Sequence, residues 1–150
     1  MDQTVLAYIY HNDKVLMLFR NKKENDINEG KYMGVGGHIE KGETPDMALI
    51  REIKEETNLD VISYKLRGKL LFINKKYQEI IYLYTVDEVK GELIECNEGD
   101  LNYFDKNEIF SLKMWEGDYY FLKLLAQNEP YFELTLVYED DVLLKIDRTL

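Results

Sequence analysis

Residues 45–57 restrict the fold more than any other part of the sequence, because they carry the start signals, the end signal and the two-faced pattern of a helix. Thr44 can accept a hydrogen bond from a free amide of the first turn, and Pro45 lacks only an N–H that would stay unpaired there. Asn58 is one of the few residues besides glycine that tolerates the left-handed conformation in which many helices end. We therefore expect a helix over residues 45–57, ending at Asn58.

This predicted helix has one apolar and one acidic face. Side chains three and four positions apart share a face, so Leu49, Ile50 and Ile53 form an apolar stripe that is expected to pack on a sheet. The acidic face combines three carboxylates at the same spacings: Glu52, Glu55 and Glu56. Arg51 lies one turn before Glu55 and can pair with it.

Three carboxylates on one helical face repel each other, which admits two interpretations. The commoner one is a solvated charged surface. The other is a site for a hard divalent cation, and Glu40 and Glu43, just before the helix, favour it. Four glycines also surround the approach, as suits backbone that passes close to a ligand: Gly34, Gly36, Gly37 and Gly42. Mg²⁺ is the usual partner of carboxylates and phosphates together, with Mn²⁺ as an alternative ion.

The bulk composition limits the partners of the chain. A net charge of −10 disfavours binding along the backbone of long nucleic acids, although cations could still bridge acidic side chains to a small phosphorylated ligand. The sequence contains neither an apolar run of about 18 residues that could span a membrane nor a secretion signal at its N-terminus. Cys96, the only cysteine, excludes an internal disulfide and a cysteine-rich zinc site. We expect a cytoplasmic protein that acts on a small molecule, as a monomer or a small homo-oligomer.

The rest of the chain alternates strand-like segments with polar turns, and no repeat or linker divides its 150 residues. An extended glycine-rich stretch covers 32–39, a polar loop covers 21–31, and a second helix fits Asp118–Gln127. Strands are expected at residues 3–10, 15–19, 61–73, 78–87, 101–104, 131–138 and 142–147. This pattern predicts one domain over residues 1–150 with a mixed sheet and two helices, an α+β or α/β sandwich.

Residues 37–59 resemble the Nudix signature G-x5-E-x7-R-E-U-x-E-E-x-G-U, in which U is a bulky aliphatic residue. The chain has Gly37, then Glu43, and then the run Arg51-Glu52-Ile53-Lys54-Glu55-Glu56-Thr57-Asn58-Leu59. Every fixed position matches except one, where Asn58 replaces a glycine, and asparagine is the next-best residue for a left-handed helix end. With this many fixed positions, the match is far more specific than a lone G-x-G-x-x-G.

The resemblance implies the Nudix fold, an α/β/α sandwich with a central mixed sheet, in which the signature forms a loop, a helix and a second loop. It also implies a magnesium site made of three glutamates and one main-chain carbonyl: Glu52, Glu55, Glu56 and the carbonyl of Gly36. Glu52 would act as base on the attacking water, and Arg51 would orient the glutamates. The implied catalytic residues are thus Glu52, Arg51 and Glu55, while Glu43 would steady the loop.

Two later segments, 91–99 and 114–118, resemble the MutT-type branch of this family, which includes 8-oxo-dGTP diphosphatases. In that branch a glutamate beyond the signature reaches the metal, which points to Glu98, with Glu95 as the second choice. The structural alternative for Glu98 is an acid in a turn. Trp115 would stack on a purine, or else pack in the core.

The same resemblance suggests further substrate-binding residues. Asp118 would read the edge of the base or else cap the second helix, and Phe72 would line the same pocket or else pack in the core. Met33 and Gly117 stand where mammalian relatives carry asparagine and aspartate, so the implied base pocket differs from theirs. Three cations could meet the phosphate tail or be ordinary surface charges: Arg20, Lys22 and Lys23.

Three functions follow from this sequence. The first is Mg²⁺-dependent hydrolysis of nucleoside triphosphates, such as the oxidised purine 8-oxo-dGTP, to a monophosphate and pyrophosphate. The second is a Nudix hydrolase that acts on ADP-ribose, dinucleoside polyphosphates or capped RNA. The third is a non-catalytic nucleotide-sensing module, which would be expected to lose signature glutamates that this chain keeps.

Overall fold

Strand β1 (Asp2–His11) lies at the centre of the computed structural model, which describes residues 1–150. Its successive side chains point to opposite faces of the sheet. Leu6 and Tyr8 belong to one buried apolar cluster, and Val5 and Ala7 belong to a second. A strand that is buried on both faces needs a covering layer on each side.

The expected mixed sheet contains nine strands, two more than predicted, because the extended stretch 32–39 forms β3 and β4. Its order is β3-β2-β1-β6-β5-β8-β9, with β4 also paired to β1 and β7 to β2. The β1–β6 and β5–β8 pairs are parallel and the other pairs are antiparallel. The remaining strands are β2 (Lys14–Arg20), β3 (Tyr32–Met33), β4 (Val35–His38), β5 (Asp60–Asn74), β6 (Tyr77–Lys90), β7 (Gly99–Asp105), β8 (Phe132–Glu139) and β9 (Val142–Arg148).

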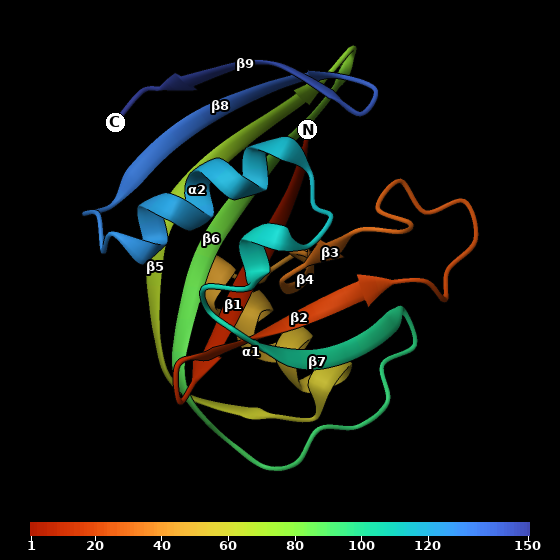
Figure 1. The fold of residues 1–150 in the computed structure, drawn as a ribbon, viewed down its shortest axis with the longest axis vertical. Coiled ribbons are helices and arrows are strands. Elements are labelled where there is room, and N and C mark those ends of the chain that lie inside the picture. The colour runs from red at the N-terminus through yellow and green to blue at the C-terminus, as the bar shows by residue number, and fades with distance from the viewer.

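The two helices cover opposite faces of this sheet (Figure 1). Helix α1 (Pro45–Thr57) packs on the face of Val5 and Ala7, and helix α2 (Glu116–Ala126) packs on the face of Leu6 and Tyr8. A short 3-10 helix, η1 (Ile109–Ser111), precedes α2. This arrangement confirms the predicted α/β/α sandwich with a mixed sheet. Neither α-helix combines the length and the apolar content that crossing a bilayer would require.

Helix α1 forms as predicted, with one correction on its apolar face. The hydroxyl of Thr44 accepts a hydrogen bond from the Met47 amide at 3.2 Å, and Asn58 adopts a left-handed φ of 69°. Leu49 and Ile53 are fully buried, but Ile50 is 43% exposed, so its assignment to the packed stripe was wrong. Ala48 is buried instead, because the buried stripe extends from Leu49 and Ile53 toward Ala48, which lies about 200° around the helix from Ile50.

Helix α2 begins two residues earlier than predicted, at Glu116 instead of Asp118. Trp115 occupies the capping position, and its side chain makes no capping hydrogen bond. The hydroxyl of Tyr138 on β8 instead accepts a hydrogen bond from the Gly117 amide at 2.7 Å. An acceptor on a distant strand therefore pairs with a free amide of the first turn, and the local sequence could not indicate this contact.

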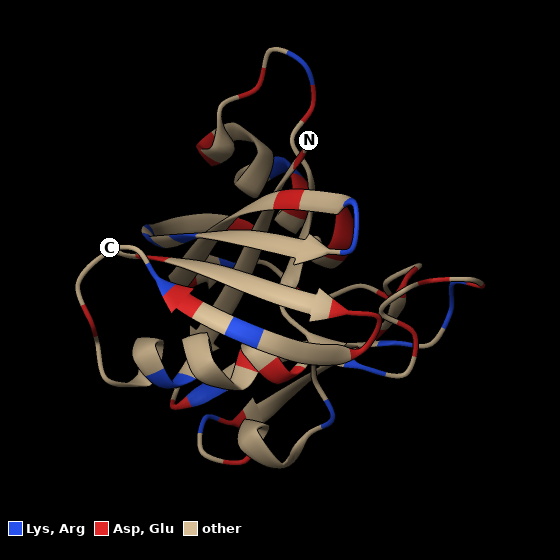
Figure 2. Cartoon of the chain, turned by 90° about the horizontal axis from the view of Figure 1, so that it is seen from above, with Lys and Arg blue, Asp and Glu red and all other residues tan.

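The predicted hairpins form, with longer strands than expected. Pairing between β5 and β6 continues from the turn at Lys75 to the pair Asp60–Lys90. Acidic and basic residues are interleaved over loops and strand ends in Figure 2, and basic residues do not gather on any one side in that view.

Candidate active site

Strand β4 brings two glycines against β1 and helix α1. Gly36 pairs with Leu6 and Gly37 pairs with Val5. A Cβ atom on Gly37 would lie 2.4 Å from the carboxylate carbon of Glu52, so the acid packs directly on this strand. The close backbone approach that the glycines predicted is thus an approach to the acidic face of α1.

Arg51 organises the loop before the helix and the helix itself. Its Nε donates to Glu43 at 2.7 Å, and its Nη1 donates to Glu52 at 2.8 Å and to Glu55 at 3.2 Å. Its Nη2 donates to the carbonyl of His38 at 2.9 Å. The Glu55 side chain is 57% exposed, whereas those of Glu43 and Glu52 are 13% exposed. Arg51 therefore holds the Glu52 carboxylate in a largely buried position, and it also holds Glu43 and with it the loop before the helix.

Glu56 is a buried acid without a complete set of partners. The residue is 9% exposed, and its Oε2 has no hydrogen-bond partner. Burial, together with the neighbouring carboxylates of Glu98 and Glu52, raises the pKa of Glu56 to about 9. Burial also raises the pKa of Glu52, although Arg51 opposes this shift. Raised pKa values mean that the nearby arginines do not fully compensate the negative charge of these acids, so that a further positive charge would stabilise their ionised forms.

These residues fit a hard divalent cation by their chemistry. The candidate side-chain ligands are carboxylate oxygens, which suit Mg²⁺, and the unpartnered Oε2 of Glu56 would gain a partner. No three acidic side chains are yet close enough together to hold an ion jointly. Glu52, Glu56 and Glu98 are the candidates to hold one, because the carboxylates of Glu52 and Glu98 both lie close enough to Glu56 to raise its pKa. Glu55 points outward to Arg51.

The predicted phosphate-binding cations lie near Glu98, but they differ in solvent exposure and in how many carboxylates they already contact. Arg20 donates from Nε to Asp26 at 2.8 Å and from Nη1 to Glu98 at 3.1 Å, and its side chain is only 10% exposed. Lys23 is 61% exposed and lies 4.0 Å from Glu98. Lys22 pairs with the exposed Glu95 at 3.0 Å. Arg20 is thus held by two carboxylates, and Lys23 is the freer cation.

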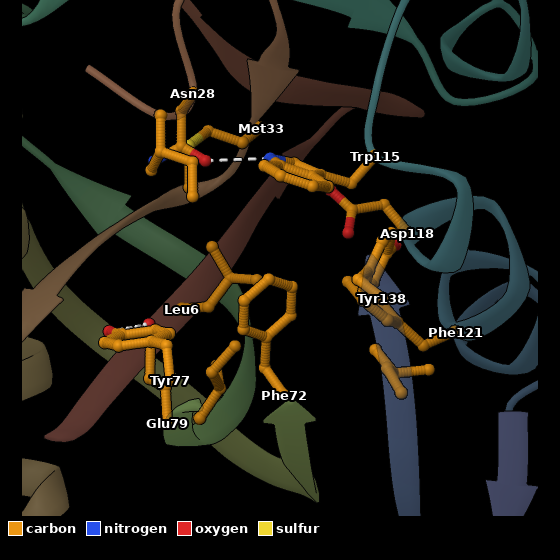
Figure 3. Close-up of a pocket in the computed structure, with 13 residues that line it drawn as sticks. Leu6, Asn28, Met33, Phe72, Tyr77, Glu79, Trp115, Asp118, Phe121 and Tyr138 are labelled. Carbon is orange, nitrogen blue, oxygen red and sulfur yellow. Dashed lines mark hydrogen bonds between the residues drawn. The ribbon is translucent and has the colours of Figure 1, made fainter. Parts of the chain in front are cut away.

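A largely apolar cavity of about 380 Å³ lies between the sheet and the start of α2 (Figure 3). The four residues that sequence reasoning assigned to the base pocket all line it: Met33, Phe72, Trp115 and Asp118. They come from β3, β5, the loop before α2 and α2 itself. The fold therefore gathers into one cavity residues that are up to 85 positions apart in the chain.

Trp115 packs in the core, as one of its two interpretations predicted, and it also lines this cavity, so that stacking on a purine stays a prediction. Its indole Nε1 donates to Oδ1 of Asn28 at 2.8 Å, and the ammonium of Lys31 lies 4.6 Å from its ring centroid. Phe72 and Tyr138 meet the indole edge to face, with centroids 5.7 and 5.1 Å away. These contacts hold the ring in one orientation at the cavity wall.

Asp118 is the third residue of α2, and its side chain faces the cavity (Figure 3). Burial raises the pKa of Asp118 to about 8, and only Lys31 opposes this effect. Burial thus favours the protonated carboxyl group, which is the form that can donate a hydrogen bond to a ligand. Gly117 cannot be replaced by an acid without a shift, because a Cβ atom there would lie 2.8 Å from the Tyr138 hydroxyl.

Sequence reasoning missed several residues of this site. Asn28 and Lys31 come from the polar loop, and Tyr77 and Glu79 line the far end of the cavity, where Tyr77 donates to Glu79 at 2.7 Å. The one available signal was that a buried indole N–H needs an acceptor. Its acceptor lies 87 positions away from Trp115, beyond the reach of any local pattern.

A mixed sheet between two helices, with an acidic helix against a glycine-bearing strand, is the architecture that the signature at 37–59 implied. The chain belongs to the Nudix family, since the model of the NUDIX domain matches residues 2–125. Members of this family hydrolyse small nucleotide substrates and generally use divalent metal ions.

Individual relatives support the same assignment. The uncharacterized Nudix hydrolase YvcI of Bacillus subtilis is 30% identical over 85% of this chain and 80% of its own length. An oxidized purine nucleoside triphosphate hydrolase of Danio rerio is 30% identical over 73% of this chain and 71% of its own. A crystal structure of a MutT protein from Bacillus halodurans matches with a TM-score of 0.90, at 24% identity, over 99% of this chain and 98% of that one. The resemblance to the MutT-type branch is thus confirmed for the fold.

Proposed function

We propose that this chain, as a single Nudix domain over residues 1–150, is a Mg²⁺-dependent hydrolase of purine nucleoside triphosphates, oxidised ones included, that releases a nucleoside monophosphate and pyrophosphate. The observation that carries the proposal is the aromatic cavity of Trp115 and Phe72 with Asp118 at its wall, where burial raises the pKa of the carboxyl group to about 8. The similarity to an oxidized purine nucleoside triphosphate hydrolase supports it. Its place of action would be the cytoplasm, where it would remove damaged nucleotides from the pool.

The acidic residues would handle the phosphate end. When bound, Mg²⁺ would neutralise phosphate charge and acidify the attacking water. Glu52 would accept the proton of that water, because Arg51 holds its carboxylate and Gly37 leaves room for it. Glu56 and Glu98 would supply further oxygen ligands, with the carbonyl of Gly36 and Glu55 as the remaining candidates. Lys23 would meet the phosphate tail from the solvent side.

The cavity would handle the base. Trp115 and Phe72 offer ring faces and edges to a purine, and Met33 fills the wall next to them. Asp118 would donate a hydrogen bond to an acceptor on the base edge. The chain has one acid, Asp118, where mammalian relatives have two, since Gly117 stands in place of the other. We therefore expect its order of preference among bases to differ from theirs.

The test is hydrolysis of a nucleotide panel with Mg²⁺, scored by kcat/KM: 8-oxo-dGTP, 2-hydroxy-dATP, the normal deoxynucleoside triphosphates, ADP-ribose and diadenosine tetraphosphate. A preference of about 100-fold for an oxidised purine triphosphate, equivalent to about 2.7 kcal/mol, would support the proposal. Preference for ADP-ribose or the dinucleotide would replace the substrate and keep the family. No turnover of any of them would favour a nucleotide-sensing role.

A further inference from the structure

The loop between β2 and β3 connects the acidic residues to the base cavity through a continuous set of contacts. Arg20, at the end of β2, donates to Glu98 at 3.1 Å and to Oδ2 of Asp26 at 2.8 Å. Oδ1 of Asp26 accepts a hydrogen bond from the backbone amide of Asn28 at 3.1 Å. Oδ1 of Asn28 in turn accepts from the indole of Trp115 at 2.8 Å. Each step joins one charged or polar group to the next.

Burial makes the first part of this connection rigid. The side chains of Arg20 and Asp26 are 10% and 7% exposed. A largely buried ion pair with hydrogen bonds on both carboxylate oxygens has few alternative arrangements, because breaking it would leave an uncompensated charge. Asp26 therefore holds both the Arg20 guanidinium, which lies next to Glu98, and the loop segment that carries Asn28.

The backbone reinforces the same geometry. The amide of Arg20 donates to the Lys31 carbonyl at 3.0 Å, and the Gly30 amide donates to the Arg20 carbonyl at 2.8 Å. The Lys31 amide also donates to the Asn28 carbonyl at 3.0 Å. Lys31 then covers Trp115 with its ammonium and pairs with Asp141 at 3.7 Å. The loop thus contacts Trp115 at two points, Asn28 and Lys31.

We propose that Asp26 is a positioning residue that couples Glu98 at the phosphate end to the orientation of Trp115 at the base end, through Arg20 and Asn28. A change at Glu98, such as cation binding, alters the partner of Arg20, and the Asp26 carboxylate transmits that change to Asn28 and the indole. Arg20, predicted as a phosphate ligand, acts in this proposal through Asp26. The inference rests on the proposed function only in taking Glu98 as a cation ligand and the cavity as the base site.

The only tryptophan of the chain offers a direct readout, because ¹⁵N-labelled protein gives a single indole Nε1–H resonance. In the wild type, Mg²⁺ added without nucleotide should shift this resonance. In Asp26→Asn the resonance should start at a different position, exchange with water faster by about tenfold, as expected for loss of one charge-assisted contact, and no longer respond to Mg²⁺.

Asp100→Asn is the matched control, because the Asp100 carboxylate accepts a hydrogen bond from Asn21 in the same loop at 2.8 Å and pairs with Lys22 at 3.7 Å, but makes no hydrogen bond or ion pair with Arg20 or Asn28. This variant should keep the wild-type position and Mg²⁺ response. If Asp26→Asn does not fold, Arg20→Gln breaks the same pair from its other side and should give the same loss. A wild-type response to Mg²⁺ in a folded Asp26→Asn or Arg20→Gln protein would overturn the proposal.

A second measurement separates this proposal from the proposed function. Binding of deoxyguanosine monophosphate, as a product-type probe, should weaken by about tenfold in Asp26→Asn, with KM raised and kcat nearly unchanged for the best triphosphate. Unchanged probe affinity and KM would also overturn the coupling. If the wild type hydrolyses no triphosphate, the proposed function fails, while the indole resonance still tests the coupling on its own.

Discussion

At the scale of residues, the neighbouring glycines differ in what lies next to them: backbone of β1 next to Gly36, and the Glu52 side chain next to Gly37. The three atoms nearest to a Cβ atom on Gly37, at 2.4 to 2.5 Å, all belong to the carboxylate of Glu52, which is the movable end of a side chain. Gly37→Ala should therefore fold almost as well as the wild type and displace Glu52. We expect kcat to fall at least about tenfold, because small misplacements of a catalytic group are costly, with a melting temperature close to that of the wild type.

Gly36→Ala provides the contrast. Its Cβ atom would lie 1.9 Å from the Val5 carbonyl oxygen, and backbone cannot move aside cheaply. This variant should lose about 1–3 kcal/mol or more of stability in urea unfolding. Equal losses of stability in the two variants would show that Gly37 serves the strand and not the acid.

The role of Glu52 has a direct test in Glu52→Gln. The amide keeps the volume and can still accept from Arg51, so the fold should be retained. Turnover should fall by at least about 100-fold, because a positioned general base contributes about that much or more. Asp60→Asn, which removes an acid that pairs with Lys54 at 3.2 Å outside the acidic cluster, is the control and should keep its activity. Near-normal kcat in Glu52→Gln would remove Glu52 from the mechanism.

At the scale of elements, the end of α1 depends on the conformation of Asn58. Its φ is 69°, which costs a residue with an ordinary side chain about 1–2 kcal/mol. Asn58→Ala should lower the free energy of unfolding by about that amount, which corresponds to a few degrees in melting temperature. Asn58→Gly should stay near the wild type, since it relieves the φ cost but loses the 3.2 Å bond from the Asn58 side chain to the Glu92 carbonyl. Equal unfolding energies for the two variants would contradict this account.

Helix α1 could be predicted from sequence because its end signals, Thr44 and Asn58, are local. Helix α2 was placed two residues late because Asp118 looks like a cap, whereas the actual partner of its first turn is Tyr138 on β8. The assignment of Ile50 to the core failed because periodicity gives the width of an apolar stripe less well than its centre.

The same distinction applies to the candidate site. The signature placed Glu52 and Glu56 together, since both lie on one helix. The residues that line the cavity could be proposed only by resemblance, and the contacts that hold Trp115 could not be proposed at all. Asn28 and Lys31 lie in a loop without periodicity, and their contacts with Trp115 exist only once the chain has folded.

At the scale of the whole molecule, the raised pKa of Asp118 predicts that stability depends on pH. Its pKa is raised from 3.8 to about 8, so the folded protein keeps a proton that the unfolded chain releases between these values. The free energy of unfolding should therefore carry a contribution that falls as pH rises from about 4 to about 8 and levels off above that. Asp118→Asn cannot ionise and should lack this contribution.

The measurement is urea unfolding of both proteins across that pH range, with a chelator present to remove metal ions. The difference between wild type and Asp118→Asn isolates the one carboxyl group, because every other titrating residue is common to both. Parallel curves would mean that Asp118 titrates normally in the folded protein.

The contact between Gly117 and Tyr138 also has an evolutionary consequence. The Tyr138 hydroxyl fills the space that any side chain at position 117 would need, and it accepts the hydrogen bond of the Gly117 amide. A second acid at position 117 therefore requires Tyr138 to shift or to become smaller, and either change disturbs the hydrogen bond at the start of α2. We therefore expect substitutions at the two positions to be coupled, so that the stability cost of an acid at position 117 depends on the residue at position 138.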